Sequence, residues 1–433
     1  MITSEWIRAA LPRSWGIARL RDHATVINGY PFDSELFSAD TGMPLVRIRD
    51  ISSEETEIRY TGDLVPAALL RGGEILIGMD GDFNVSRWRG GEALLNQRVC
   101  CVRPARTIDA RFLYYVLPAP LRLINEFTYS TTVKHLSSFD VLKIHIPFPS
   151  LPQQRTIANY LDRETARLDA LVTAKERVLG LLAEKRRALI TRAVTRGLDP
   201  RAPLRDSGVP WLDKIPAHWE MVALRFLVDI SGGATPDTGK PELWDGDIPW
   251  VSPKDMKRAE IGDVEDHVSS AALSASALRL IDPGAVLIVV RGMILAHSFP
   301  TATTTRQVTI NQDMKALRCR SSLEPHFLRG FFWGVESHLV SLVDSAAHGT
   351  RKLDTEVLGR LEVCVPPLNE QRAIVAHISE KSARLDELRS ATERTIILIK
   401  ERRAALIAAA VTGQVDVSWV PESIDCAAKE MSC

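Results

Sequence analysis

A stretch of about 50 residues that occurs twice constrains this chain more than any other feature of its sequence. Residues 149–199 align without gaps with residues 366–416, and about 23 of the 51 positions are identical. Gln154-Arg155, for example, matches Gln371-Arg372. The fold therefore has to accommodate two copies of one element.

Both copies have the apolar spacing of a coiled-coil helix. In each, leucine or isoleucine recurs along one seven-residue spacing, and a further leucine lies three positions after one of them. The predicted seam contains Leu161, Leu168, Leu171, Leu182 and Leu189 in the first copy, and Ile378, Leu385, Leu388, Ile399 and Leu406 in the second. Pro152 and Pro366-Pro367 are suited to helix starts, and Gly197 and Gly413 to helix ends. Each helix should run for about 40 residues, or roughly 60 Å.

A helix of this length with a narrow apolar seam is not stable alone, because it has to bury that seam against another surface. The other copy is the obvious partner. The alternative is that the two helices are unrelated, each lining its own domain.

The segments between the helices also resemble each other, though more faintly. Leu11-Pro12 and Trp15 correspond to Ile215-Pro216 and Trp219, Asn96-Gln97 to Asn311-Gln312, and Phe112-Leu113 to Phe327-Leu328. Short strand-like runs begin directly after glycine turns, as at Gly73 and Gly284. Short helices are expected over 110–117 and 324–335. The prediction is an α+β fold with pseudo-twofold internal duplication. Its parts are residues 1–147 and 200–364 as globular domains, residues 148–199 and 365–416 as long helices, and residues 417–433 as a C-terminal tail.

Composition bounds the function classes. The 433 residues carry 54 basic and 54 acidic side chains, so net charge gives no support to a nucleic-acid partner. The N-terminus has no signal-peptide pattern, and no apolar run is long enough to span a bilayer, so we expect a cytoplasmic protein. The six cysteines have neither zinc-site spacing nor disulfide-scaffold density.

No catalytic motif stands out. The glycine loop from Gly233 to Lys240 has the wrong spacing for a phosphate loop. Asp237 and Asp255 with Lys257 could in principle serve a metal-dependent nuclease, but scattered acids of this kind are common. No Asn-Pro-Pro-aromatic element of an amino-methyltransferase is present. We therefore predict a binder or scaffold, with no catalytic residue and no metal or other cofactor of its own.

The sequence resembles a known family, the specificity subunits of type I restriction-modification systems. The resemblance covers essentially the whole chain. It is carried by Gly232-Gly233-Ala234-Thr235-Pro236, by residues 246–251 and 44–50, by Thr132-Val133-Lys134-His135-Leu136, and by the run from Pro366 to Arg372 into the second helix. Gln153 departs from the pattern, because the second copy has Glu370 there, which puts in doubt an ion pair at this position.

The resemblance implies a non-catalytic subunit of a DNA methylation and endonuclease complex. Each globular segment would be a target recognition domain that reads half of a split double-stranded DNA sequence. The long helices would form an antiparallel coiled coil that spaces the two domains. Two methyltransferase subunits would dock on it, and motor-nuclease restriction subunits could join them. Neither a membrane nor a small-molecule substrate is implied.

Positively charged residues beside glycine turns or in loops are the DNA-binding candidates, since arginine and lysine contact phosphates and guanine edges. They are Arg47, Arg49, Arg87, Arg89 and Lys134 in the first domain, and Lys254, Arg291, Arg351 and Lys352 in the second.

On the outer faces of the helices, Arg155, Arg167, Arg372 and Arg384 are candidates for a partner interface. A coiled-coil adaptor that binds only proteins is the main alternative, and the neutral net charge favours it.

Overall fold

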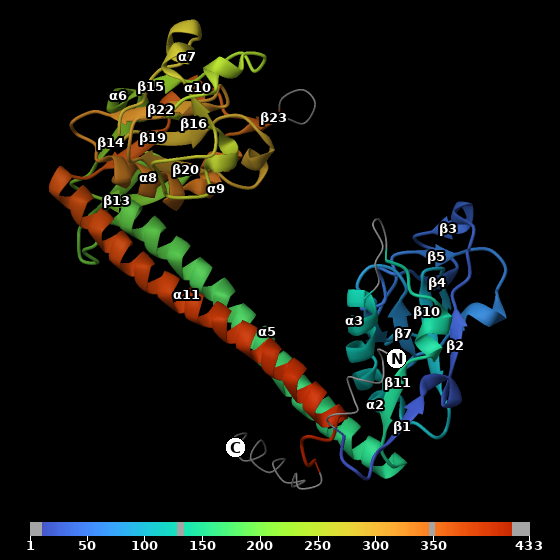
Figure 1. The fold of residues 1–433 in the computed structure, drawn as a ribbon. Coiled ribbons are helices and arrows are strands. Elements are labelled where there is room, and N and C mark those ends of the chain that lie inside the picture. The colour runs from blue at the N-terminus through green and yellow to red at the C-terminus, as the bar shows by residue number, and fades with distance from the viewer. Residues whose placement is uncertain (1–10, 128–133, 346–350, 418–433) are drawn as a thin grey trace. The chain divides into compact units, whose positions relative to one another are not determined.

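The computed structural model describes residues 11–127, 134–345 and 351–417. It divides into two compact units (Figure 1). Unit 1 combines residues 1–175 with 394–433, and unit 2 spans residues 176–393. Each unit therefore holds one globular domain with segments of both long helices. Thr132 and Val133, which carry part of the family resemblance, and the tail beyond residue 417 lie outside the described residues.

The two predicted long helices are confirmed as α5 (Leu151–Arg196) and α11 (Leu368–Val411). Pro152 lies in the first turn of α5, and Pro366-Pro367 directly precede α11. Gly197 and Gly413 follow the last turns with φ of 72° and 71°, a left-handed conformation that glycine adopts without steric cost.

The helices pair with each other, in antiparallel orientation, as Figure 1 shows for the green and red ribbons. In unit 2, Arg186 Nη1 of α5 lies 2.6 Å from Asp386 Oδ1 of α11. In unit 1, Arg403 Nε of α11 lies 2.9 Å from Asp169 Oδ1 of α5. The two ion pairs occupy equivalent positions of the sequence repeat with the roles of the helices exchanged, so both are consistent with the same register.

The predicted seam residues on the seven-residue spacing are buried or half-buried, whereas the prediction was wrong for the two leucines three positions after that spacing. Leu161, Leu168 and Leu385 are buried, and Leu182, Leu189, Ile378, Ile399 and Leu406 are half-buried. Leu171 and Leu388, by contrast, are 43% and 51% exposed. The second row of the seam instead lies four positions after the seven-residue spacing, at Thr165, Val172, Leu179 and Arg186. This register lets Arg186 reach Asp386 and lets the Thr165 hydroxyl lie 3.1 Å from that of Tyr115.

The globular domain of unit 1 is built mainly of short strands in three sheets. The largest are a four-stranded antiparallel sheet and a five-stranded sheet in which β4 and β9 pair in parallel. The four-stranded sheet contains, in order, β2 (Ala24–Asn28), β10 (Val99–Pro104), β7 (Ile75–Gly78) and β8 (Val85–Arg87). The five-stranded sheet contains β3 (Phe37–Ser38), β5 (Arg59–Tyr60), β4 (Met43–Val46), β9 (Ala93–Leu95) and β6 (Leu69–Leu70). The third sheet pairs β1 (Gly16–Arg19) with β11 (His145–Phe148), and the helices are α2 (Ala110–Val116), α3 (Pro118–Phe127) and α4 (Ser138–Leu142).

The domain of unit 2 repeats this plan with additions. Its main sheet contains β15 (Val228–Gly232), β22 (Met314–Cys319), β19 (Val286–Val289), β20 (Thr301–Thr304) and β17 (Glu260–Ile261). A smaller sheet contains β18 (His267–Val268), β16 (Ile248–Val251) and β21 (Thr309–Ile310). Two-stranded pairs are β12 (Leu204–Val209) with β13 (Leu212–Pro216), β14 (Glu220–Ala223) with β25 (Glu362–Val365), and β23 (Asp344–Ser345) with β24 (Arg351–Lys352). The helices are α6 (Leu224–Leu227), α7 (Ser270–Ala275), α8 (Pro325–Gly334), α9 (Glu336–Ser341) and α10 (Thr355–Gly359).

The predicted resemblance between the domains is visible in their topology. The parallel pair β4–β9 corresponds to β16–β21, and the closing pair β1–β11 corresponds to β14–β25. At Gly29 and Gly233 the chain runs so close to the carbonyls of Asn96 and Ile310 that a Cβ atom has no room. Glycine is therefore required at both equivalent positions.

Each domain packs against the start of its own long helix and the end of the other. In unit 1 the core includes Ile157 and Leu161 of α5 with Ala410 and Val411 of α11. In unit 2 the core includes Ile190, Ala193 and Val194 of α5 with Ile374 of α11. Burial of apolar surface by the helices is thus shared between the seam and the domains, which explains how such long helices are stable.

A fully buried glutamine joins each long helix to a short helix of its domain. Gln154 accepts a hydrogen bond at 2.8 Å from the backbone N–H of Asp109, the N-cap of α2, and donates to the Pro149 carbonyl at 2.9 Å. Gln371 accepts at 2.8 Å from the N–H of Glu324, the N-cap of α8. Its amide also donates to the carbonyls of Ser322 and Pro366, at 2.9 and 2.8 Å.

We predict that Gln371→Leu destabilises unit 2 by about 1–3 kcal/mol, because it leaves the buried Pro366 carbonyl and the partly buried N–H of Glu324 and carbonyl of Ser322 without this partner. Chemical denaturation of the full chain measures the change. Gln414→Leu, at an exposed glutamine, serves as the control and should stay within about 0.5 kcal/mol of wild type. Equal stability of the two variants would show that the amide contributes nothing.

Candidate nucleic-acid interface

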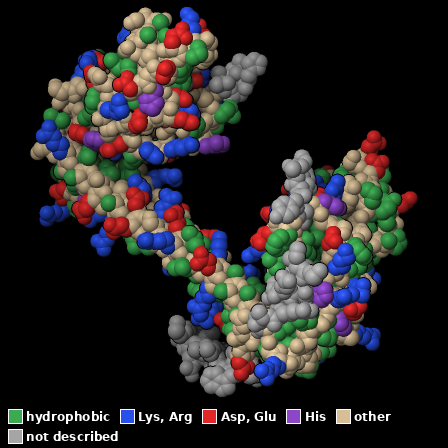
Figure 2. All heavy atoms as spheres, viewed as in Figure 1, with side chains coloured by type: hydrophobic (Ala, Val, Ile, Leu, Met, Phe, Trp, Pro, Cys, Tyr) green, Lys and Arg blue, Asp and Glu red, His purple; other side chains and the backbone are tan. Residues whose placement is uncertain are grey.

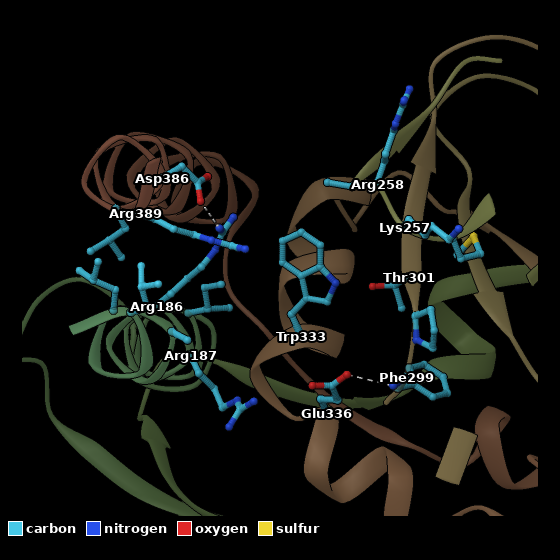
Figure 3. A pocket seen from close by; sticks show the side chains of 18 of the residues that line it. Arg186, Arg187, Lys257, Arg258, Phe299, Thr301, Trp333, Glu336, Asp386 and Arg389 are labelled. Atoms are coloured by element: carbon cyan, nitrogen blue, oxygen red, sulfur yellow. Dashed lines mark hydrogen bonds and ion pairs between the residues drawn. The ribbon is translucent and has the colours of Figure 1, made fainter. Parts of the chain in front are cut away.

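In unit 2 a groove lies between the helix pair and the globular domain (Figure 3). The helices contribute Arg186 and Arg187 from α5 and Arg389 from α11. The domain contributes Lys257 and Arg258 from the loop before β17, together with side chains of β20, α8 and α9. The groove is therefore lined by cations from three separate parts of the sequence.

Only some of these cations are neutralised within the chain. Arg186 pairs with Asp386, and Arg389 Nε lies 2.9 Å from Glu393 Oε1. Arg187, Lys257 and Arg258 are exposed and form no ion pair with a described residue. Cations of this kind are available to the phosphates of a nucleic acid, whose backbone supplies most of the electrostatic attraction in such complexes.

Several polar contacts join the elements on the domain side of the groove. Arg329 donates from Nη1 to the Ala259 carbonyl and to Thr303 Oγ1, both at 2.8 Å, and its guanidinium lies 5.0 Å from the ring centroid of Trp333. Burial lowers the pKa of Arg329 from its usual value. Glu336 accepts a hydrogen bond at 2.9 Å from the N–H of Phe299 (Figure 3).

Unit 1 has a corresponding groove. Arg87 and Arg89 line it from β8 and the following residues, and Asp169 and Arg403 line it from the helices. Arg87 Nε is buried without a hydrogen-bond partner among the described residues, and Arg89 lies 3.4 Å from Glu54.

Tyr115 of α2 lines the unit 1 groove and contacts the long helix α5. Its hydroxyl donates to Asp162 Oδ1 at 2.8 Å. Burial raises the pKa of Tyr115 to about 12.

The grooves are built from the same elements of the repeat. Each has a loop that follows an aspartate, Asp50 in unit 1 and Asp255 in unit 2. Each also has an antiparallel neighbour of the central strand (β8 or β20), the first helix after the main sheet (α2 or α8), and both long helices. Duplication has therefore produced two equivalent grooves.

The predicted DNA-binding residues of the first domain have different surroundings in the structure. Arg87 and Arg89 lie in the groove, and Arg49 is exposed. Arg47 is only 17% exposed and pairs with Asp50 at 2.9 Å, a hydrogen bond that raises its pKa. Lys134 donates from Nζ to the carbonyl and side-chain oxygens of Asn125, at 2.8 and 2.7 Å.

In the second domain, Arg291 and Lys352 are brought together by a backbone bridge, and Arg351 precedes Lys352 in β24. Lys254 lies in the short 3-10 helix Pro253–Asp255. It is exposed and pairs with Asp266 at 2.8 Å, a hydrogen bond that raises its pKa.

The predicted partner-interface residues lie on the exposed faces of the helices. These are Arg155 and Arg167 on α5, and Arg372 and Arg384 on α11. Arg167 is 73% exposed and lies 3.7 Å from Glu164. At this position of the repeat, Glu370 Oε2 lies 2.8 Å from His218 Nε2, whereas Gln153 accepts hydrogen bonds from the N–H and hydroxyl of Ser150.

Sequence reasoning missed most cations of the unit 2 groove. Arg186 and Arg403 occupy equivalent positions of the repeat, but the sequence does not indicate that they pair with Asp386 and Asp169 across the helices. Arg258 was not considered, and Lys257 was considered only as a nuclease residue. The identity of Arg186 and Asp386 with their repeat counterparts was the available signal.

The alternative nuclease reading receives no support from the acids that suggested it. Asp255 accepts from the N–H and hydroxyl of Ser252, both at 2.9 Å, and so caps a turn. Asp237 accepts from the N–H of Gly239 at 3.0 Å. Within the part of the chain that is described, no group of three His, Cys, Asp or Glu side chains could hold a metal.

Figure 2 shows acidic and basic side chains interspersed on the visible faces of the domains and along the helices. No described helix is both long and apolar enough to cross a bilayer.

Comparison with known proteins gives a consistent result. The profile of the family described as "Type I restriction modification DNA specificity domain" matches residues 12–179 and 216–396. The EcoBI specificity subunit of Escherichia coli is 26% identical over 441 residues, which cover 97% of this chain and 90% of that protein. The EcoR124I/EcoR124II specificity subunit, also of Escherichia coli, is 29% identical over 61% of each chain.

Solved structures agree at the level of the fold. A chain from a study of assembly and conformational transition of the type I restriction-modification system superposes with a TM-score of 0.72, at 19% identity over 94% of this chain and 99% of that one. The HsdS subunit of Thermoanaerobacter tengcongensis gives a TM-score of 0.52, at 19% identity over 94% and 98% of the two chains. With two matches to the family profile that together cover most of its length, this chain belongs to the type I restriction-modification DNA specificity family and is a non-catalytic specificity subunit.

Proposed function

We propose that each domain of this specificity subunit reads one half of a bipartite double-stranded DNA target, and that the helix pair sets the spacing between the half-sites. Two methyltransferase subunits dock on the helices and modify the DNA, and motor-nuclease subunits join them. Because the proposed recognition and modification take place on DNA, we expect the protein in the cytoplasm. The observation that carries this proposal is the presence of two equivalent, cation-lined grooves, each formed by one domain and the helix pair.

The grooves suit DNA despite the neutral net charge. Arg187, Lys257 and Arg258 offer unneutralised cations in unit 2, and Arg87 and Arg89 lie in the unit 1 groove. Phosphate contacts position a protein on the duplex, while base contacts from neighbouring loops give specificity. Two unlike domains can read unlike half-sites, which a symmetric homodimer cannot do.

Removing two groove cations should weaken DNA binding for all sequences alike. For Lys257→Ala/Arg258→Ala, we expect the slope of log affinity against log salt to fall in magnitude by about 2, because two phosphate contacts are lost. Gel-shift titration of the complex with methyltransferase, at several salt concentrations, measures it. Arg225→Ala/Arg279→Ala removes two exposed cations outside the groove and should leave the slope unchanged.

The same titration separates the proposal from the adaptor alternative, which the neutral charge favours. A wild-type complex that binds random and target DNA no better than the methyltransferase alone would support a protein adaptor.

Partner docking is proposed for the exposed helix faces that carry Arg167 and Arg384, which occupy equivalent positions of the repeat. Arg167→Glu/Arg384→Glu should prevent recovery of a complex with two methyltransferase subunits in size-exclusion chromatography, because reversed charge repels a partner that is complementary to arginine. Arg177→Glu/Arg394→Glu makes the matched change at another exposed, equivalent pair. Recovery of intact complex from the Arg167/Arg384 variant would place docking elsewhere.

The helix pair should act as a ruler. Inserting four residues at facing positions of α5 and α11 lengthens the pair by about 6 Å, close to 2 base pairs. Sequencing of methylated DNA should then show the same half-sites with a spacer about 2 base pairs longer. An unchanged spacer contradicts the ruler role.

A further inference from the structure

The two domains share one backbone frame at the end of their central strands. In unit 1, Met79 N–H donates to the Arg98 carbonyl at 2.8 Å, and Leu136 N–H donates to the Met79 carbonyl at 2.7 Å. In unit 2, Val290 N–H donates to the Asp313 carbonyl at 2.8 Å, and Leu353 N–H donates to the Val290 carbonyl at 2.9 Å.

The frame continues into the next residues. Asp80 forms a backbone bridge with His135, as Arg291 does with Lys352. The following glycines, Gly81 and Gly292, both have positive φ and donate to the carbonyls of Lys134 and Arg351, at 3.3 and 3.0 Å. Asp80 is therefore the structural counterpart of Arg291, and Arg98 is the counterpart of Asp313.

On this shared frame the charges are exchanged. In unit 1, Arg98 Nη1 lies 3.3 Å from Asp80 Oδ2, and His135 Nδ1 lies 2.8 Å from Asp80 Oδ1. In unit 2, Arg291 Nε lies 4.0 Å from Asp313 Oδ1. We call Asp80, Arg98 and His135 the Asp80 cluster, and Arg291, Asp313 and Lys352 the Arg291 cluster.

In both clusters the arginine is the more accessible member. Arg98 and Arg291 are 55% and 53% exposed, whereas Asp80 and Asp313 are 22% and 28% exposed. Asp80 accepts a hydrogen bond from Arg98 at 3.3 Å, whereas Asp313 lies beside Arg291 at 4.0 Å without a hydrogen bond. Both guanidiniums keep donors toward solvent. A guanidinium that is exposed in this way presents the paired N–H groups that match guanine O6 and N7 in the major groove.

Two local features support a role in recognition rather than in stability. Arg98 has a φ of 73°, a conformation that is unfavourable for a non-glycine residue and is typically kept at functional positions. Beside Arg291, Met293 is 65% exposed, so its side chain is accessible to an apolar contact such as a thymine methyl group.

We propose that Arg98 and Arg291 are the guanine-reading residues of the two domains, and that Asp80 and Asp313 position them. Exchange of acid and base between the two frame positions shifts the arginine, and therefore the guanine it reads, to a different place in each half-site. This inference rests on the proposed reading of a bipartite target, and it assigns specificity to named residues.

The test is to exchange the charges in one domain only. Asp80→Arg/Arg98→Asp retains an ion pair, and aspartate tolerates the left-handed conformation of position 98 better than arginine does. In the complex with methyltransferase, mapping of methylated adenines over a random DNA library should show the guanine preference of the first half-site moving to another position. Methylation of the original target should fall about tenfold to hundredfold, and the second half-site should stay unchanged.

Arg71→Glu/Glu92→Arg is the matched control. It exchanges an exposed ion pair of the same domain and should change neither half-site. Arg98→Ala covers the case in which the exchange variant does not assemble, and should remove discrimination at one base pair of the first half-site. Unchanged specificity in an assembled Arg98→Ala or exchange complex would overturn the inference. A wild-type complex without sequence preference would instead overturn the proposed function itself.

Discussion

The structure depends on how two long helices are held to two separate domains, and the buried glutamine at the start of each helix is central to this. Gln154 and Gln371 saturate their amides with backbone groups of the helix start and of the N-cap of α2 or α8. A buried amide without partners is costly, so each glutamine fixes the direction in which its helix leaves the domain. Apolar contacts at the helix ends then add burial without having to specify geometry.

Two interhelical ion pairs contribute to the register of the helices, together with the apolar contacts at the helix ends. The seam is only half-buried over much of its length and has polar members such as Thr165, so apolar contacts alone would tolerate a shift of register. Arg186 with Asp386 and Arg403 with Asp169 favour the observed register in unit 2 and in unit 1. The same four side chains line the grooves, so the residues that align the helices also shape the surfaces proposed to receive DNA.

Much of the fold could be predicted because it is local or repeated in the sequence. The helix ends at Gly197 and Gly413 and the correspondence of the two domains were predicted on that basis. The second row of the seam was not predicted correctly, because Leu171 and Val172 are both apolar. Only the contacts of Thr165 with Tyr115 and of Arg186 with Asp386 decide between the two spacings. The unit 2 groove was also missed, since Arg186, Arg258 and Arg389 are far apart in sequence. Whether Arg49, Arg351 and the other candidates contact DNA remains a prediction, whereas Arg47 and Lys134 already have partners within the domain.

The central claim is that duplication has placed two different readers on one pair of helices. Mapping of methylated adenines in cells that contain this chain and its methyltransferase tests it most directly. The account predicts a motif of two unlike half-sites separated by a constant number of unspecified base pairs, with one methylated adenine in each. A single uninterrupted motif, or half-sites with a variable gap, would contradict it.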